Sequence, residues 1–450
     1  MKETDTICAI STAISGSAIN IIRISGEDSI KIANGILSGL DLTKAKGNTI
    51  SHASVKDKDG NIIDEVLVSL FRAPKSYTKE DVVEINTHGG AFVTTQVLEL
   101  LLNSGARLAE PGEFTKRAFL NGRIDLSQAE AVMDMIDSST KNSLLLANKA
   151  LKGDIKTLVE GLRAEIEDVL LHITVNIDYP EYTDELQITN DLLKEKTKYL
   201  ISKIEKIIVD AESLRYYKEG IKTVILGKPN VGKSSLLNAL LKENKAIVTS
   251  FSGTTRDIVE GDINLGGIIL HLIDTAGIRK TDDPIEKIGI EKSIEKLYDA
   301  ELVLLVLDQS QDLTFEDKEL LEKTKNKTRI IIGNKSDLPK ANLNIKNVVD
   351  ISSLKQEGLE NLKDEIKKLF IKDSLKISQD LVISSSRHIS IMKRALDSLK
   401  DARNNAINGD FLDMVEIDLR EAYNALGEII GRGNPDELID ELFARFCLGK

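Results

Sequence analysis

The segment Gly227-Lys-Pro-Asn-Val-Gly-Lys-Ser234 has the residue types and spacing of a phosphate-binding loop, G-x-x-x-x-G-K-[ST]. The apolar run 223–226 before it is typical of a strand, and residues 235–241 after it have a helical pattern. In that setting the backbone N–H groups of the loop and the N-terminus of the helix point at phosphate oxygens. We therefore predict that Lys233 reaches the β- and γ-phosphates of a nucleotide and that the Ser234 hydroxyl binds Mg²⁺.

Two further strand ends indicate which nucleotide the loop takes. Residues 270–277 form a strand that ends in D-x-x-G, where Asp274 would hold Mg²⁺ through water and the Gly277 N–H would contact the γ-phosphate. Residues 330–337 form a strand that ends in N-K-x-D. The Asp337 carboxylate can accept hydrogen bonds from the N1–H and 2-amino groups of guanine, and adenine has neither donor there.

A weaker strand, residues 348–353, ends in Ser352-Ser353 and would bring its loop to the guanine carbonyl. The usual residues after that first serine are Ala-Lys, whereas this chain has Ser353-Leu354. Four motifs in this order, each at a strand end, predict a GTP-binding domain.

The residue that should orient the attacking water is missing from its usual position. Ras-type GTPases have a Gln directly after D-x-x-G. Here that residue is Ile278, which cannot hydrogen-bond water, so either hydrolysis is poor or another group does this work. The acidic candidates just downstream are Asp282, Asp283 and Glu286, and for any one of them a solvated surface acid is the favoured interpretation.

Two features suggest a monovalent cation beside the phosphates. Asn230 lies inside the phosphate loop, where its side-chain oxygen could face a cation. The segment Ser252-Gly-Thr254-Thr255-Arg-Asp257 precedes a predicted hairpin, and its Thr255 is placed to complete the Mg²⁺ coordination. A cation near the β/γ bridge would supply the positive charge that an arginine finger supplies in other GTPases.

Composition excludes several other classes of protein. The chain has 450 residues, 41% of them hydrophobic and 29% charged, with no apolar run near the roughly 20 residues of a membrane span. The first residues contain acids and no apolar segment, so we expect no signal peptide, no membrane and a cytoplasmic protein. The net charge of −12 argues against nucleic-acid binding by bulk charge, although a local basic patch would be compatible with it. The two cysteines, Cys8 and Cys447, make no disulfide framework.

The rest of the chain supplies the elements that flank these motifs. Residues 1–118 are predicted to be an α/β domain, with strands near 6–11, 20–25, 65–71 and 81–86 and a helix over 91–103. From about residue 125 the apolar residues recur at helical spacing, with stripes over 155–170, 200–214 and 412–429.

The apolar helix faces before and after the GTP-binding segment have no apolar surface within that segment against which to pack. We predict that they pack on each other, so that a Ras-like P-loop GTPase domain, residues 215–375, is inserted into an all-α domain made of 119–214 and 376–450. Two unrelated helical domains are the alternative.

At this point the residues resemble one family over the whole chain, the tRNA modification GTPase MnmE (TrmE) family. Besides the phosphate loop with its Asn230, the resemblance rests on the segments Ile21-Ile-Arg23-Ile-Ser-Gly26, Asp81-Val-Val-Glu84, His88-Gly-Gly90, Pro111-Gly-Glu-Phe114, Arg117-Ala-Phe-Leu-Asn121, Asp125-Leu-Ser-Gln-Ala-Glu130, Gly253-Thr-Thr-Arg-Asp257 and Phe446-Cys447-Leu-Gly-Lys450. The sequence departs from the family in having Arg123 where the family has Lys and in the loop 11–18, which is often rich in Pro and Gly.

The resemblance implies that the chain works with a flavin-dependent, FAD-binding partner, MnmG, as a heterotetramer on tRNA. The pair would add a carboxymethylaminomethyl or aminomethyl group at C5 of wobble uridine 34. The one-carbon unit would come from 5,10-methylene- or 5-formyl-tetrahydrofolate, bound by the N-terminal domain, which also forms a homodimer. The GTPase domains would meet face to face during hydrolysis, which K⁺ would stimulate.

The resemblance also assigns residues to these roles. Folate would be bound by Arg23, Glu84, Arg123 and Lys450. K⁺ would be bound by Asn230 and the backbone of Thr249, Phe251 and Thr254, and Mg²⁺ by Ser234 and Thr255. The catalytic residues would be Glu286, Lys233, Thr255 and, for the uridine chemistry, Cys447. The nucleotide site, from the motifs and the resemblance together, would contain Asn230, Val231, Gly232, Lys233, Ser234, Ser235, Thr249, Ser250, Phe251, Ser252, Gly253, Thr254, Thr255, Asp274, Thr275, Ala276, Gly277, Asn334, Lys335, Asp337, Ser352 and Ser353.

Other interpretations stay open. Cys447 stands four residues from the end, at prenylation spacing, but Gly449 and Lys450 fit that signal poorly; a buried small apolar residue is the plainer alternative. A ribosome-assembly GTPase would share the nucleotide motifs but not residues 1–118 or the terminal Cys-Leu-Gly-Lys. A folate sensor with vestigial GTPase activity is disfavoured because it would not need the intact Lys233, Ser234, Thr255 and Asp274.

Overall fold

The computed structural model describes residues 5–14, 17–178, 190–243, 261–273, 297, 299–341, 343–371, 382–409 and 411–449. The chain forms two compact units. The first combines Met1–Met133 with Gly427–Lys450, and the second is Asp134–Leu426. Among the described residues no helix is both long and apolar enough to cross a membrane.

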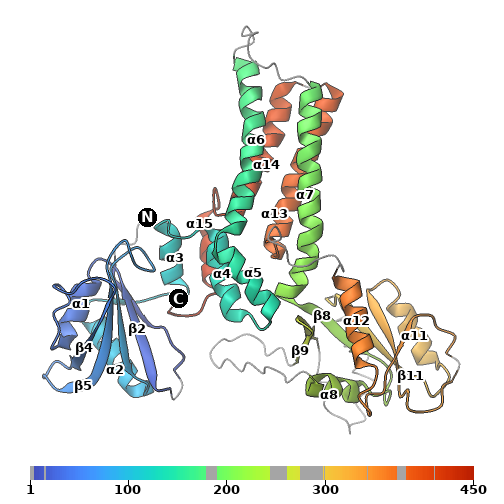
Figure 1. The fold of residues 1–450 in the computed structure, drawn as a ribbon, viewed down its shortest axis with the longest axis horizontal. Coiled ribbons are helices and arrows are strands. Elements are labelled where there is room, and N and C mark those ends of the chain that lie inside the picture. Colours follow the sequence, from blue (N-terminus) through green and yellow to red (C-terminus); the bar gives the residue numbers. More distant parts are fainter. Residues whose placement is uncertain are drawn as a thin grey trace. The chain divides into compact units, whose positions relative to one another are not determined.

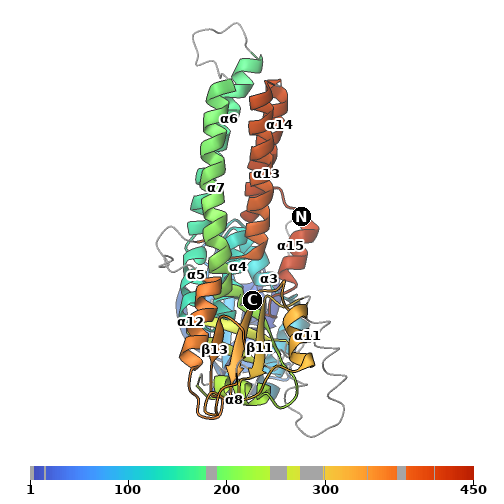
Figure 2. The same ribbon diagram turned by 90° about the vertical axis from the view of Figure 1, so that its right-hand side faces the viewer.

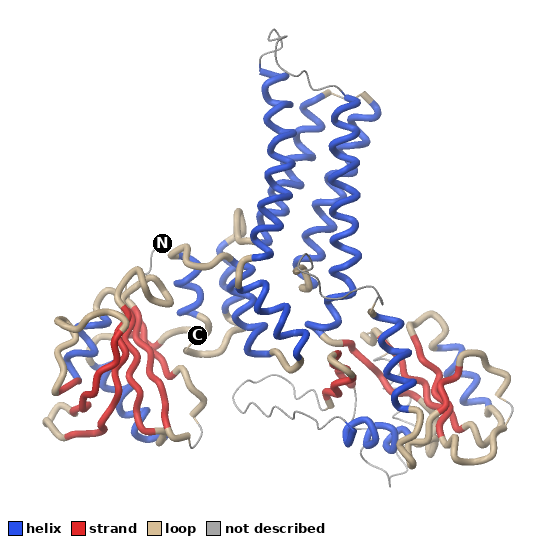
Figure 3. The backbone as a smooth tube through the Cα atoms, in the orientation of Figure 1, coloured by secondary structure: helices blue, strands red, loops and turns tan. Residues whose placement is uncertain are grey.

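The first unit is built on a seven-stranded sheet in the order β3-β4-β5-β6-β2-β1-β7 (Figures 1 and 3). Its strands are β1 Ile7–Ile10, β2 Ile19–Ser25, β3 Leu37–Ser38, β4 Thr49–Lys56, β5 Ile62–Phe71, β6 Val82–His88 and β7 Arg107–Leu108. The helices α1, Ser29–Ile36, and α2, Ala91–Asn103, bury their apolar residues against the core side chains of these strands. Helix α2 has the bounds that the sequence predicts, and β1, β2, β5 and β6 confirm the four predicted strands to within a few residues.

The end of the chain packs into this first unit. Helix α3, Glu113–Leu120, is followed by α4, Leu126–Asp137, and the last helix is α15, Asp436–Phe443. The ring of Phe443 lies 6.2 Å from that of Phe119 and 5.1 Å from that of Phe446, measured between centroids. The close approach of the two segments requires glycine at position 112, whose φ is +70° and where a Cβ would lie 2.6 Å from the carbonyl oxygen of Phe443.

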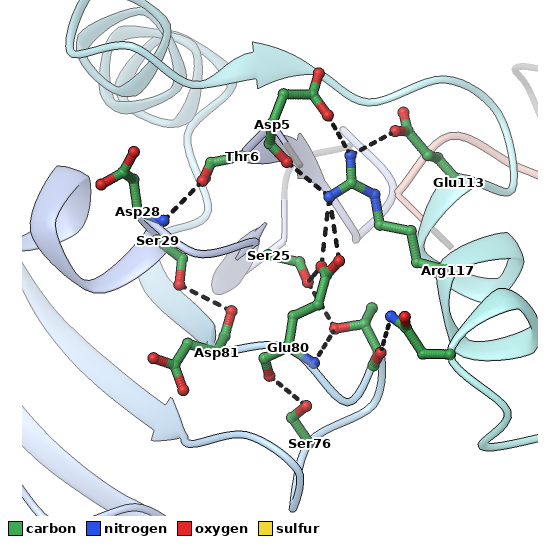
Figure 4. Close-up of polar contacts among 12 residues, drawn as sticks. Asp5, Thr6, Ser25, Asp28, Ser29, Ser76, Glu80, Asp81, Glu113 and Arg117 are labelled. Atoms are coloured by element: carbon green, nitrogen blue, oxygen red, sulfur yellow. Dashed lines mark hydrogen bonds and ion pairs between the residues drawn. The ribbon is translucent and has the colours of Figure 1, made fainter. Parts of the chain in front are cut away.

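A buried guanidinium fastens α3 to the sheet (Figure 4). Only 3% of the Arg117 side chain is exposed, and its nitrogens lie 3.0 Å from Glu113 Oε1 and 2.7 Å from Asp5 Oδ1. Glu80, which accepts a hydrogen bond from Ser25, lies 3.4 Å from the same guanidinium. Burial alone would lower the pKa of Arg117, but the surrounding carboxylates raise it, so the side chain stays charged. The network thereby fixes the helix that leads into the Arg123 loop.

In the second unit, four long helices run side by side (Figures 1 and 2). They are α6 Asp154–Asp178, α7 Asn190–Glu219, α13 Ser386–Asn408 and α14 Leu412–Ile429, with the shorter α5, Lys141–Leu151, before them. The three predicted apolar stripes lie mostly in their buried faces. The guanidinium of Arg163 in α6 lies 3.9 Å from the ring centroid of Tyr423 in α14, and Lys393 in α13 lies 2.6 Å from Glu212 in α7. Helices from before and after the nucleotide motifs therefore contact each other.

Between α7 and α13 the chain forms a six-stranded sheet in the order β13-β12-β11-β8-β10-β9. The strands are β8 Ile221–Leu226, β9 Asp262–Leu265, β10 Ile268–Leu272, β11 Leu302–Asp308, β12 Arg329–Asn334 and β13 Val348–Asp350. All pair in parallel except β9, which forms a hairpin with β10. Both faces are covered, one by α8, Lys233–Glu243, and α12, Leu359–Phe370, and the other by α11, Phe315–Lys323 (Figure 2).

Strand β11 lies in the middle of this sheet, between β12 and β8, and was not predicted from the sequence. All seven of its residues are buried, because alternate side chains belong to the apolar cluster with α8 and α12 on one face and to the cluster with α11 on the other. A strand covered on both faces has no alternation of polar and apolar residues. The run of apolar residues that ends at Asp308 was the signal that would have predicted it.

Candidate nucleotide site and a second polar site

The predicted phosphate loop connects β8 to α8, as its motif requires. Gly227 has a φ of +156°, and a Cβ there would lie 2.4 Å from the carbonyl oxygen of Val306 in β11. Gly232 has a φ of +96°, and a Cβ there would lie 2.1 Å from Asn334 Nδ2. Gly227 is therefore needed because the loop backbone packs directly against the backbone of β11, and Gly232 lies against the side chain of Asn334 at the end of β12, the strand beyond β11.

Lys233 is the first residue of α8, and its ammonium lies against the loop. Its Nζ donates to the carbonyl oxygens of Gly227, at 2.8 Å, and Lys228, at 2.9 Å. The helix N-terminus that begins here presents backbone N–H groups and the positive end of the helix dipole. Phosphate oxygens fit such a site, and the cation of Lys233 stands beside it.

A single amide joins the phosphate loop to the base-recognition loops. Asn334, 2% exposed at the end of β12, donates from Nδ2 to the carbonyl oxygen of Val231, at 2.8 Å. Its Oδ1 accepts from the Ser353 backbone N–H, at 3.1 Å, and from the Ser353 hydroxyl, at 2.9 Å. The structure thus brings together predicted residues from three separate stretches.

The two other residues of N-K-x-D are also held by side chains. Lys335, at a φ of +66°, places Nζ 2.6 Å from Oδ2 of Asp308, a carboxylate that sequence reasoning missed. Burial would raise the pKa of Asp308, but the bonds from Lys335 and from Ser310 lower it. Asp337 accepts from the Ser352 hydroxyl at 2.7 Å, and this bond lowers its pKa. An ionised Asp337 is an acceptor only, which suits the two donors on the edge of guanine.

Much of the predicted catalytic machinery lies outside the described residues. This holds for the other predicted cation ligands besides Asn230 and Ser234, for the catalytic acid and for the γ-phosphate contacts. The residues concerned are Thr249, Ser250, Phe251, Ser252, Gly253, Thr254, Thr255, Asp274, Thr275, Ala276, Gly277 and Glu286. Of the predicted metal ligands, Ser234 follows Lys233 in the first turn of α8, and Asn230 stands in the loop with a φ of +62°. Their roles toward Mg²⁺ and K⁺ stay predictions.

A second group of polar residues forms in the first unit, on neighbouring strands. Arg23 in β2 and Glu84 in β6 are direct partners in the strand register, and Arg23 Nε lies 2.8 Å from Glu84 Oε1. The carbonyl oxygen of Gly449 accepts from the Ser11 hydroxyl at 3.0 Å and lies 3.4 Å from Arg23 Nη1. The chain end therefore reaches the predicted folate residues, although Lys450 itself lies outside the described part of the chain.

Two aromatic rings line this second group, and neither was predicted from the sequence to take part in it. The Arg23 guanidinium carbon lies 5.6 Å from the ring centroids of both Tyr77 and Phe114. That of Arg123 lies 4.7 Å from the Tyr77 ring, and Arg123 Nη1 donates to the Tyr77 carbonyl oxygen at 2.9 Å. Arg23 and Arg123 thus converge on one tyrosine, and Glu84 is the ion-pair partner of Arg23. The position of Tyr77 in the loop between β5 and β6 gave no motif.

The two cysteines have different surroundings. Cys447 is half-buried, and its carbonyl oxygen accepts from the Gly112 N–H at 3.3 Å, next to the turn that leads to Phe114. Cys8 is fully buried in β1, and burial raises the pKa of its thiol to about 12. Cys8 therefore stays a neutral thiol in the core, whereas Cys447 is only partly buried.

A mostly parallel sheet covered by helices on both faces, with a phosphate loop after β8 and N-K-x-D after β12, defines a P-loop GTP-binding protein. The family descriptions "MnmE helical domain" and "GTP-binding protein TrmE N-terminus" match residues 126–447 and 6–123. The chain belongs to the MnmE (TrmE) family of tRNA modification GTPases.

Two relatives match over nearly their whole length. The tRNA modification GTPase MnmE of Lactococcus lactis subsp. cremoris (strain MG1363) is 48% identical over 453 residues, which cover 100% of this chain and 99% of the relative. That of Acholeplasma laidlawii (strain PG-8A) is 49% identical over 446 residues, covering 99% of each. Among solved structures, a variant of Aquifex aeolicus Era bound to GDP.AlF4- is 27% identical over 40% of this chain and 66% of that one, with a TM-score of 0.25; the family assignment rests on the sequence matches alone.

We predict that Asp337→Asn weakens GTP binding by at least about 100-fold, because the amide cannot accept both guanine donors. The same variant should gain affinity for xanthosine triphosphate, whose 2-carbonyl can accept from the new amide. Competition against a fluorescent guanine nucleotide measures both. The matched control is Asp312→Asn, an exposed acid in the loop between β11 and α11. Unchanged GTP affinity in Asp337→Asn would remove this carboxylate from base recognition.

Proposed function

We propose that this GTPase serves tRNA modification and that, with the flavin-dependent partner MnmG and its FAD, it adds a carboxymethylaminomethyl or aminomethyl group at C5 of wobble uridine 34. GTP hydrolysis drives a conformational cycle and is not itself the uridine chemistry. Guanine-nucleotide binding is supported by one observation: Asn334 joins the phosphate loop to the loop that contains Ser353. The tRNA part is supported by family membership over the full chain.

The first unit is proposed to bind the one-carbon donor, 5,10-methylene- or 5-formyl-tetrahydrofolate. A carboxylate such as Glu84 can accept from the N–H groups of a pterin ring, and guanidinium groups such as Arg23 and Arg123 suit the carboxylates of a glutamyl tail. Arg23 already contacts Glu84 and the carbonyl of Gly449, and it shares the Tyr77 ring with Arg123. Lys450 would add a further cation, and the nearby Cys447 would supply the thiol for the uridine chemistry.

Arg23→Met should weaken binding of 5-formyl-tetrahydrofolate to the full chain by about tenfold or more, because a charged hydrogen-bonding group is lost. Isothermal titration calorimetry measures this. Lys31→Met, which removes an exposed lysine paired with Asp28, is the matched control and should bind like wild type. Absence of binding heat in the wild-type chain would overturn the folate assignment and leave the nucleotide site untouched.

The proposed hydrolysis uses K⁺, with Asn230 as its one side-chain ligand and Glu286 orienting the attacking water. Asn230 has a left-handed backbone, which Asn and Gly tolerate and most other residues do not. The variant Asn230→Gly therefore removes the side-chain oxygen while keeping the loop conformation. We expect GTP hydrolysis by wild type to be faster in K⁺ than in Na⁺ by about tenfold or more, and this difference to disappear in Asn230→Gly. Equal wild-type rates in the two salts would contradict the proposal.

We also propose a homodimer through the first unit, which joins with MnmG as a heterotetramer. In support, β4 and β5 carry Ile50 and Leu67 on their exposed face, 68% and 47% exposed. Sedimentation equilibrium of the full chain measures the dimer, and a monomeric mass at micromolar concentration would contradict it.

The decisive experiment is mass spectrometry of tRNA nucleosides from cells that lack this chain, rescued by wild type or variants. We expect the carboxymethylaminomethyl-type uridines to vanish and to return only with wild type. Asp337→Asn should fail because the guanine site is lost, and Cys447→Ser should fail while its purified protein still hydrolyses GTP. Unchanged nucleosides with accumulating ribosomal subunits would instead favour a GTPase of ribosome assembly.

A further inference from the structure

A second lysine in the phosphate loop makes an ion pair that none of the nucleotide motifs explains. Lys228, the second residue of the loop, is 13% exposed, and its Nζ lies 2.9 Å from Oδ2 of Asp317 in α11. The same ammonium lies 3.5 Å from the hydroxyl of Thr314. Asp317 is 3% exposed, so this pair is not one of the solvated surface pairs that contribute little.

The acidic partner is fixed by its own helix. Asp317 Oδ2 also accepts from the Thr314 backbone N–H, at 3.0 Å, and from the Thr314 hydroxyl, at 2.8 Å, so it closes the capping box at the start of α11. Its other oxygen, Oδ1, is buried and has no hydrogen-bond partner among the described residues. Removing the lysine would therefore leave a buried carboxylate without its counter-ion.

Lys228 links the backbone of the predicted phosphate loop to α11. The carbonyl oxygen of Lys228 accepts from Lys233 Nζ, while its side chain reaches away to Asp317. The next residue, Pro229, has a fixed φ and no N–H with which to anchor the loop. The side chain of Lys228 is thus what ties this stretch of backbone to a helix on one face of the sheet.

We propose that Lys228 and Asp317 are positioning residues that hold the phosphate loop in its nucleotide-binding conformation and so set the affinity for GTP and GDP without contacting either. The inference rests on the proposed function, since it presupposes that the loop binds a guanine nucleotide. Loss of the pair lets the loop backbone sample other conformations, and this raises the free energy of the bound state relative to the free one.

The test compares Lys228→Met, Asp317→Asn, the double variant and Lys228→Arg in the full chain. Each single variant should raise the Kd for both GDP and GTP by about tenfold, the contribution of one charged hydrogen bond. The double variant should be little worse than either single variant, because both break the same contact. Lys228→Arg should restore most of the affinity, and kcat at saturating GTP should stay within about twofold of wild type, because the pair touches no reacting atom. Lys325→Met, at an exposed pair with Glu322, is the control.

Three outcomes would overturn the inference. If Lys228→Met lowers the melting temperature but binds GDP like wild type, the pair only stabilises α11. If the fold-increases in Kd of the two single variants multiply in the double variant, the two residues act independently and not through their ion pair. If wild type itself fails to bind GDP, the proposed nucleotide function falls and this inference falls with it, whereas either of the first two results leaves that function standing.

Discussion

The nucleotide site depends on one buried amide. Asn334 uses both ends of its side chain, donating to the carbonyl of Val231 and accepting twice from Ser353. A buried polar group that loses its partner costs more than the hydrogen bond itself contributes, so the three loops cannot separate without leaving such groups behind. Because the strands that precede these loops are parallel, their carboxyl ends meet at one edge of the sheet, and a single side chain can reach all three. Asn334 thereby fixes the distance between the phosphate loop and the loops proposed to bind the guanine base.

The first unit has the same kind of arrangement. Its polar groups also come together from distant parts of the chain. The strand register sets Arg23 opposite Glu84, and the buried Arg117 network fixes α3, from which the Arg123 loop follows. The chain end then adds the carbonyl of Gly449. These groups come from separate segments of the sequence, so the site exists only when the sheet, α3 and the last helix have all formed.

Motifs that are local in sequence were predictable, and contacts between distant residues were not. The phosphate loop, N-K-x-D and helix α2 follow from short patterns with a direct physical meaning, and the structure has them where the patterns place them. Lys228 and Asp317 are 89 residues apart, and no pattern in either segment points to the other. Tyr77 is one aromatic residue in a loop, and only the fold shows that Arg23 and Arg123 converge on it. The roles of Thr255 and Glu286, which lie outside the described residues, stay predictions.

The phosphate loop itself shows why a local motif needs a non-local frame. Its sequence supplies glycines that permit positive φ angles. These glycines do not make the loop rigid, because glycine loses more conformational freedom on folding than any other residue. The loop is held in one conformation by contacts with other elements. Gly227 lies against Val306 of β11, and Val231 accepts a hydrogen bond from Asn334 of β12. Lys228 forms an ion pair with Asp317 of α11. Each contact comes from a different element, and β11, the central one, is a strand that no motif marks. A loop whose pattern can be read in one short segment therefore acquires its binding conformation from strands and a helix that lie far along the chain, beyond β10.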